Sequence, residues 1–375
     1  MRIAFGRALG AMPAMALAMA LWPALAGAQA PAAPAATPPA TTPDTPAIRL
    51  GATIFTNYTF QASPEITDAD GNTVNRNAFD VARAYLNVTG NISRHIAFRI
   101  TPDISRETNT ASSLAGSLVF RIKYGYLQAN LDDWLTPGSF ARLGIQQTPY
   151  LDYLEGIYRY RFQGTLFVER AGYFSSADAG ASFRYNMPSN YGDVHVGLYN
   201  GEGYTRAEAN DQKAIMIRGS VRPFATGAPL LRGLRAALLY DADQYLKEAE
   251  RTRLVGNVTF EHRFINVGFE YIDATDRISA LPTAATVHGT GYSLWATPKT
   301  STTGTGWEGL LRYDHLRPNT ANQQQQNRMI LGVAYWFPHL GTVTSALLFD
   351  YDAQLFKNIV TTPTKSVAVH ALVNF

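Results

Sequence analysis

Apolar and polar side chains alternate with a period of two along most of this sequence, from residue 48 to its last residue. In the stretch RHIAFRI, for example, the apolar side chains of Ile96, Phe98 and Ile100 fall on one face, and the polar ones of His95 and Arg99 fall on the other. The same alternation recurs in INVGFEYID (265–273), GWEGLLRYDH (306–315) and SVAVHALVNF (366–375). Because successive side chains of a β-strand point to opposite faces, this pattern predicts strands with one apolar and one polar face.

The composition of the two faces favours a membrane barrel over a secreted soluble β-protein. The polar face of a soluble sandwich meets bulk water and carries many charges. Here only 16% of residues are charged, and the polar faces mix Asn, Gly, Thr and Ser with charges of both signs. Aromatic residues fall at the ends of several apolar faces, as at Tyr85, Tyr126 and Tyr271. Aromatic girdles flanking an apolar band are typical of outer-membrane barrels.

The first residues resemble an export signal. A start with two arginines is followed by an uncharged apolar stretch and by the small residues Ala26, Gly27 and Ala28, so residues 1–28 are predicted to be a cleaved signal peptide. Residues 29–47 are rich in Ala, Pro and Thr and are predicted to be a disordered linker. The predicted barrel therefore comprises residues 48–375.

Charge and cysteine content exclude several classes of protein. Cleavage of the signal removes two of the 32 basic side chains and leaves 30 against 29 acidic ones, a balance that argues against a nucleic-acid partner. The chain has no cysteine, which excludes disulfide scaffolds and cysteine nucleophiles. No run of about 18 apolar residues follows the signal, so no transmembrane helix is expected.

Sixteen strands can be placed between residue 48 and the end of the chain, and the connections between them alternate between short and long. We therefore expect an all-β, antiparallel transmembrane barrel with short periplasmic turns and long extracellular loops. Backbone groups in hydrocarbon need partners, so the sheet must close on itself. The terminal Phe375 lies on the apolar face and suits recognition by barrel-assembly machinery.

Several stretches resemble the phosphate-selective porins O and P, taken as a broad family. They include FDVARAYLNVTGNISRHIAFRITPDI, RLGIQQTPYLDYLEGIYRYRFQGTLFVERAGYF, GLYNGEGY and WEGLLRYDHLRPN, in this order. The resemblance implies a sixteen-stranded barrel in the outer membrane of a Gram-negative-type bacterium, a homotrimer, and an inward-folded third loop that narrows each pore. Phosphate-selective members line the pore with clustered lysines and a ladder of arginines. Here the six lysines are scattered, which puts phosphate selectivity itself in question.

The polar face of the early strands is locally basic. The alternation places six cations there, and they are the predicted pore wall: Arg83, Arg99, Arg121, Lys123, Arg142 and Arg184. One interpretation is a positive path that favours anions, and the other is a set of cross-strand ion pairs that only fill the lumen.

Residues 149–176 lack clean alternation, and a loop of this length in a compact fold is usually functional. Aromatic residues are interleaved with charges of both signs, which suits a loop packed against the inside of a barrel. The predicted constriction residues are Glu155, Arg159, Arg161, Glu169 and Arg170. An extracellular lid and an inter-subunit loop remain alternatives.

These observations favour an outer-membrane porin that passes small anionic or neutral solutes by passive diffusion, surrounded by lipid and lipopolysaccharide. The alternatives are an adhesin or receptor barrel with a plugged lumen, and a barrel hydrolase. The seven histidines lie in no metal-ligand or nucleophile motif, and GLYNGEGY opens no helix. No catalytic residue, metal or cofactor is therefore expected.

Overall fold

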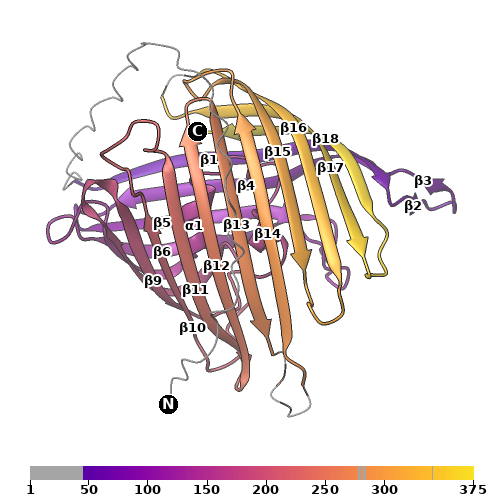
Figure 1. Cartoon of the computed structure of the whole chain (residues 1–375), viewed down its shortest axis with the longest axis horizontal. Coiled ribbons are helices and arrows are strands. Elements are labelled where there is room, and N and C mark those ends of the chain that lie inside the picture. The colour runs from indigo at the N-terminus through magenta and orange to yellow at the C-terminus, as the bar shows by residue number, and fades with distance from the viewer. Residues whose placement is uncertain (1–44, 278, 280, 282–283, 340) are drawn as a thin grey trace. The chain divides into compact units, whose positions relative to one another are not determined.

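The computed structural model describes residues 45–277, 279, 281, 284–339 and 341–375. Sixteen antiparallel strands form a closed barrel, which confirms the predicted fold class (Figure 1). The predicted signal peptide, residues 1–28, and most of the predicted linker lie outside the described residues. The barrel strands are β1 (Ala47–Ser63), β4 (Asn77–Asn91), β5 (Ile96–Arg106), β6 (Leu118–Asn130), β7 (Phe140–Gln147), β8 (Ala177–Asn186), β9 (Gly192–Tyr199), β10 (Ala214–Val221), β11 (Leu234–Leu246), β12 (Ala249–His262), β13 (Ile265–Asp276), β14 (Val287–Pro298), β15 (Gly306–Arg317), β16 (Gln325–Trp336), β17 (Thr344–Lys357) and β18 (Thr364–Asn374).

Each strand pairs with its neighbours in the sequence, and the first strand closes the sheet against the last. β1 pairs with β18 through contacts that include Thr53 with Asn374 and Tyr58 with Val369. On its other edge β1 pairs with β4. The closed ladder leaves no strand edge with unpaired backbone groups facing the hydrocarbon, which a spanning sheet requires.

The side chains are arranged with the polar face inward. On β15 and β17 the outward residues Leu311 and Phe349 are 48% and 58% exposed, whereas the inward Arg312 and Asp350 are buried. A soluble sandwich would bury the leucine and phenylalanine instead. The apolar face therefore forms the outer surface of the barrel, and the polar face forms its interior, as the period of two predicted.

Two residues that the sequence placed on the apolar face point inward instead. The rings of Tyr85 and Tyr126 lie over the cationic groups of Lys123 and Arg142, at 4.9 Å and 4.7 Å. Both tyrosines therefore belong to the lumen. Strand alternation is interrupted nearby, because the β1–β4 register skips Ala82 of β4 and the β5–β6 register skips Lys123 of β6. An extra residue of this kind changes which residues of a strand share a face.

The connections contain the remaining elements. A small hairpin of β2 (Ile66–Thr67) and β3 (Thr73–Val74) projects beyond one end of the barrel (Figure 1). Short helices α1 (Pro149–Glu155) and α2 (Phe167–Arg170) lie between β7 and β8, and a 3-10 turn, η1 (Pro188–Asn190), precedes β9. Within the described part of the chain, every helix is too short or too polar to cross a membrane.

Connections on the side of the β1–β4 loop are mostly long, and those on the opposite side are mostly short. Loops 107–117, 148–176 and 200–213 lie on the first side, and turns 92–95 and 263–264 lie on the second. Two connections depart from this pattern, a tight turn at 247–248 and a longer loop at 222–233. The 148–176 and 200–213 segments fold back into the barrel and shape the site described next.

Candidate pore lining and constriction

The 148–176 segment lies inside the barrel, because it bonds to strands around much of the inner wall. The Arg218 guanidinium of β10 donates to the Pro149 carbonyl at 3.0 Å, and that of Arg312 on β15 donates to the Thr165 carbonyl at 3.2 Å. The Gln163 amide donates to Asp352 of β17 at 3.2 Å. Strands from β10 to β17 therefore hold this segment against one side of the lumen.

An aromatic cluster anchors the middle of the segment. Tyr158 packs edge-on against Trp295, and both Tyr160 and Phe162 pack edge-on against Trp336, with ring centroids 5.1–5.7 Å apart. All five side chains are buried. Edge-to-face packing and the burial of this much apolar surface stabilise the inward fold of the segment.

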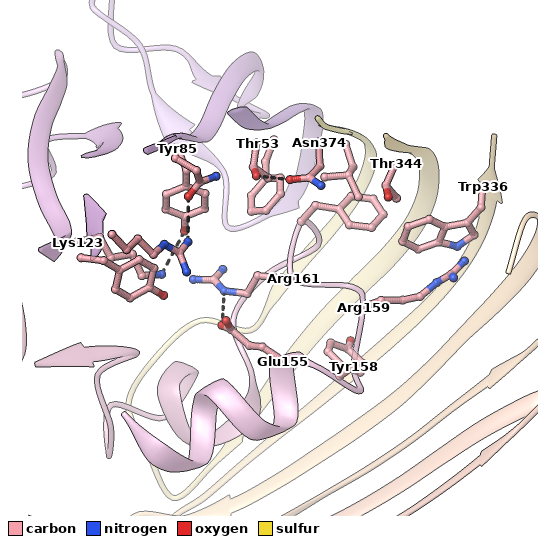
Figure 2. Close-up of a pocket in the computed structure, with 16 residues that line it drawn as sticks. Thr53, Tyr85, Lys123, Glu155, Tyr158, Arg159, Arg161, Trp336, Thr344 and Asn374 are labelled. Carbon is pink, nitrogen blue, oxygen red and sulfur yellow. Dashed lines mark hydrogen bonds and ion pairs between the residues drawn. The ribbon is translucent and has the colours of Figure 1, made fainter. Parts of the chain in front are cut away.

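A cavity of about 420 Å³ remains between the segment and the opposite side of the barrel (Figure 2). Figure 2 shows Lys123 and Tyr85 on one side of it, Arg161 and Glu155 on the segment, and Trp336 on β16. The described residues that line it are Thr53, Phe55, Tyr85, Asn87, Arg99, Lys123, Tyr124, Glu155, Tyr158, Arg159, Arg161, Phe162, Trp336, Thr344, Leu372 and Asn374.

Three of the predicted constriction residues form one charge network. Arg161 donates to Glu155 at 2.9 Å and lies 3.6 Å from Glu169. Burial raises the pKa of Glu155, although Arg161 and Lys123 act in the opposite direction. The network thus places one cation between two carboxylates, and two of its members, Glu155 and Arg161, face the cavity.

Arg159 and Arg170 lie apart from this network. The Arg159 guanidinium stacks on the Trp336 ring at 3.4 Å and lies 3.1 Å from Glu308, at the edge of the cavity. Arg170 lies behind the segment, where it donates to Gln163 at 3.1 Å and approaches Asp314 at 4.0 Å. Burial and neighbouring arginines lower the pKa of Arg170 to about 9, so it remains charged at pH 7.

The predicted wall residues divide into paired and unpaired cations. Arg83 and Arg121 share the buried Asp103, at 2.7 Å and 3.3 Å, and Arg184 pairs with Asp193 at 3.0 Å. These three contacts are the cross-strand ion pairs that the sequence left as an alternative.

The other three wall cations, Arg99, Lys123 and Arg142, have no carboxylate within ion-pair distance among the described residues. Arg99 bonds to Asn87 and Thr101, Lys123 bonds to the Tyr85 hydroxyl at 3.3 Å, and Arg142 bonds to Gln128 and Gln147. Aromatic rings also contact these cations. The cationic groups of Arg99 and Lys123 both lie over the Tyr124 ring, 4.4 Å and 5.4 Å from its centroid. Cation–π contacts hold these side chains in place without cancelling their charge.

The sequence reasoning missed Tyr204, which lies in the second inward-folded loop, 200–213. Its hydroxyl donates to Asp103 at 2.9 Å and accepts from Arg83 at 3.2 Å, and its ring lies 5.4 Å from the Arg121 guanidinium. The loop leaves β9 and reaches the wall formed by β4, β5 and β6. The glycines of GLYNGEGY were the available signal, because Gly201 and Gly203 adopt positive φ and let the chain turn inward.

The sequence profile of the phosphate-selective porins O and P matches residues 56–255. The chain belongs to this family. A search of curated protein sequences found no match. Structurally, the porin is similar to an anion-selective porin from Comamonas acidovorans, with 13% identity, a TM-score of 0.60, and coverage of 88% of this chain and 100% of the other.

Two further solved structures share the fold of this porin. The outer-membrane channel DcaP of Acinetobacter baumannii has 10% identity and a TM-score of 0.58, with 88% of this chain and 98% of that chain covered. The trimer form of OmpT from Vibrio cholerae has 13% identity and a TM-score of 0.53, with 88% and 100% covered. The family and the barrel identify the protein as a porin of the outer membrane.

Proposed function

We propose that this porin conducts small solutes by passive diffusion and favours anions, without catalytic turnover. The proposal rests on one observation. Three lumenal cations, Arg99, Lys123 and Arg142, have no described carboxylate within ion-pair distance, and Arg99 and Lys123 line the cavity beside the 148–176 segment. An uncompensated positive wall in a narrow, low-dielectric passage attracts anions and repels cations.

The cations succeed one another along the height of the barrel. Arg121 and Lys123 are two residues apart on one face of β6, a separation of about 7 Å along the strand. Arg99 and Arg142 follow on the neighbouring strands β5 and β7. An anion leaving one site therefore meets the next within roughly a Debye length, which is about 8 Å at physiological ionic strength. We expect the preference to weaken as salt concentration rises.

A preference for small anions in general is proposed, and phosphate selectivity is not. Of the six lysines, Lys123 alone lines the cavity between the segment and the wall. The lining also includes neutral polar groups such as Asn87, Thr53 and Asn374. A site for a multiply charged oxyanion would gather several cations around one point. In this structure the unpaired cations are distributed along the wall.

The proposal extends to processing and assembly. Residues 1–28 would be removed as a signal peptide and 29–47 would act as a linker. The apolar outer face would contact lipid and lipopolysaccharide, and Phe375, which is 58% exposed, would be read by barrel-assembly machinery. We propose a homotrimer, which is supported by the trimer form of the similar OmpT.

Planar-bilayer recordings of the refolded protein test the function. We expect steady conductance steps and a reversal potential that shows chloride preference in a KCl gradient. Arg99→Gln combined with Lys123→Gln should shift the reversal potential toward cations, because two unpaired charges leave the passage. The matched control, Arg49→Gln with Arg263→Gln, removes the same formal charge away from the cavity and should leave selectivity unchanged.

Two outcomes would contradict the proposal. Silent bilayers from protein that migrates as a folded barrel would favour the plugged adhesin or receptor, since the 148–176 segment already fills the β10–β17 side of the lumen. An equal shift in the control pair would show that the Arg99 and Lys123 side chains do not set selectivity locally.

A further inference from the structure

A second cavity, of about 320 Å³, lies on the other side of the 148–176 segment and is acidic. Its walls come from the end of that segment, from the 200–213 loop, and from strands β8, β11 and β12. Four carboxylates line it, together with two guanidinium groups: Asp178, Glu202, Asp241, Asp243, Arg206 and Arg251. The lining therefore carries an excess of two negative charges.

Three of these carboxylates are already engaged by the protein, and for Glu202 the donor to Oε1 is the Asn210 amide, at 2.8 Å. Asp178 accepts from the backbone N–H groups of Ala179 and Gly201, at 2.7 Å and 2.9 Å. Asp243 accepts from the backbone N–H of Gln244 and from Arg251. Gly201 has φ of +105°, and a Cβ there would lie 2.6 Å from the Asp243 carboxylate. Only glycine lets the 200–213 loop approach the acidic wall this closely.

The buried carboxylate of Asp241 points to a ligand. Its side chain is buried, with 3% of the residue exposed, it lines the cavity, and its Oδ1 atom has no hydrogen-bond partner among the described residues. The Glu202 Oε2 atom in the same cavity is also buried and without such a partner. Buried carboxylate oxygens without a donor are costly to fold, so a donor supplied from outside the chain would be bound favourably.

We propose that this cavity binds an organic cation, an alkylammonium or guanidinium group carried by a small solute. An ammonium group brings three N–H donors and a positive charge, which match the orphan acceptors and the net charge of the lining. The rings of Tyr173 and Phe174 also face the cavity and offer cation–π contact. Among the described residues no three acidic, histidine or cysteine side chains converge closely enough to hold a metal ion, so the wider organic cation fits better.

The acidic cavity and the cationic wall are separated by a few residues of one loop. Gly201, Glu202 and Gly203 line the cavity, whereas the next residue, Tyr204, contacts Arg83 and Asp103 on the opposite wall. A solute that carries both an ammonium and an anionic group would meet a complementary charge on each side of this loop. The inference itself goes beyond the proposed anion preference and does not rest on it.

Isothermal titration calorimetry on the refolded full chain in detergent at pH 7.5 tests the site without requiring conduction. The probe is 1,5-diaminopentane, and 1,5-pentanediol is the uncharged control of the same length. We expect the diamine to bind and the diol not to. Asp241→Asn should weaken diamine binding at least tenfold. The matched control Asp350→Asn, which removes another buried lumenal carboxylate on β17, should keep the wild-type affinity.

The proposal is overturned if the wild-type protein binds the diamine no better than the diol, or if folded Asp241→Asn keeps the wild-type affinity. If Asp241→Asn fails to show the heat-modifiable migration of a folded barrel, Glu202→Gln replaces it, because Glu202 lies on a loop outside the strand ladder. Weaker diamine binding by Glu202→Gln supports the site, and unchanged binding overturns it.

Discussion

Glu155 and Arg161 face the proposed passage as partners on one segment, 2.9 Å apart, with Lys123 on the opposite wall. Arg161 keeps its charge over the accessible pH range, whereas Glu155 does not. The net charge around the passage therefore depends on pH, and this dependence can be measured.

Acidification should increase chloride preference through Glu155. Burial raises the pKa of this carboxyl above its ordinary value, so protonation begins at a higher pH than for an exposed glutamate. As pH falls through that raised pKa, one negative charge leaves the passage. Reversal potentials recorded from pH 8 to pH 5 should move toward chloride. Glu155→Gln should show the shifted value already at pH 8 and change less with pH; an equal pH response in both proteins would contradict the assignment.

Single residues also show where sequence reasoning reached its limit. Alternation alone predicted that Arg83, Arg99, Arg121 and Lys123 face the lumen. It placed Tyr85 on the lipid side, because a tyrosine at the end of a strand suits a membrane girdle equally well. In the structure, Tyr85 bonds to Lys123, a contact between strands that no local pattern encodes.

At the scale of the element, the 148–176 segment is held by aromatic packing as well as by its charges. The length and lack of alternation of residues 149–176 predicted a special loop. They did not predict that Tyr160 would be fully buried against Trp336, a residue 176 positions further along the chain.

Tyr160→Ala should loosen the segment and leave the barrel intact. Truncating a buried aromatic side chain costs about 3 kcal/mol, and here that cost falls on the docking of one segment. We expect a larger and noisier single-channel conductance with unchanged barrel migration on gels. Phe264→Ala, in an exposed turn, is the control and should conduct like the wild type. Wild-type conductance in Tyr160→Ala would show that the segment does not limit the passage.

The 200–213 loop makes a second testable contact. Tyr204→Ala removes the bonds to Asp103 and Arg83 and the ring beside Arg121, so the loop should leave the wall and conductance should rise. Tyr204→Phe keeps the ring and loses the hydroxyl bonds, and its effect should be smaller. Recordings in 1 M KCl compare the three proteins, and equal conductance in all of them would place the loop outside the rate-limiting passage.

At the scale of the whole molecule, the barrel exposes apolar side chains around its outer wall and buries charged ones inside. Leu311→Arg puts a charge in the middle of β15 on the lipid face, where a cation at the bilayer midplane costs about 2–4 kcal/mol. The free energy of unfolding of this variant in lipid vesicles, measured by urea titration, should fall by that amount. Leu311→Met should be nearly neutral. A tolerated arginine would mean that this face does not meet hydrocarbon.

The sequence by itself determined the barrel and the general division into an apolar lipid face and a polar lumenal face, because both follow from a period of two that each strand carries locally. The tertiary structure alone decided which lumenal charges are neutralised. Arg121 is paired because Asp103 lies opposite it in the β5–β6 register, whereas Lys123, two residues further, bonds to the Tyr85 hydroxyl and lies over tyrosine rings. Ion pairing depends on register and on loops that fold back from distant positions. The same alternation is compatible with many such arrangements, and only the folded barrel selects one.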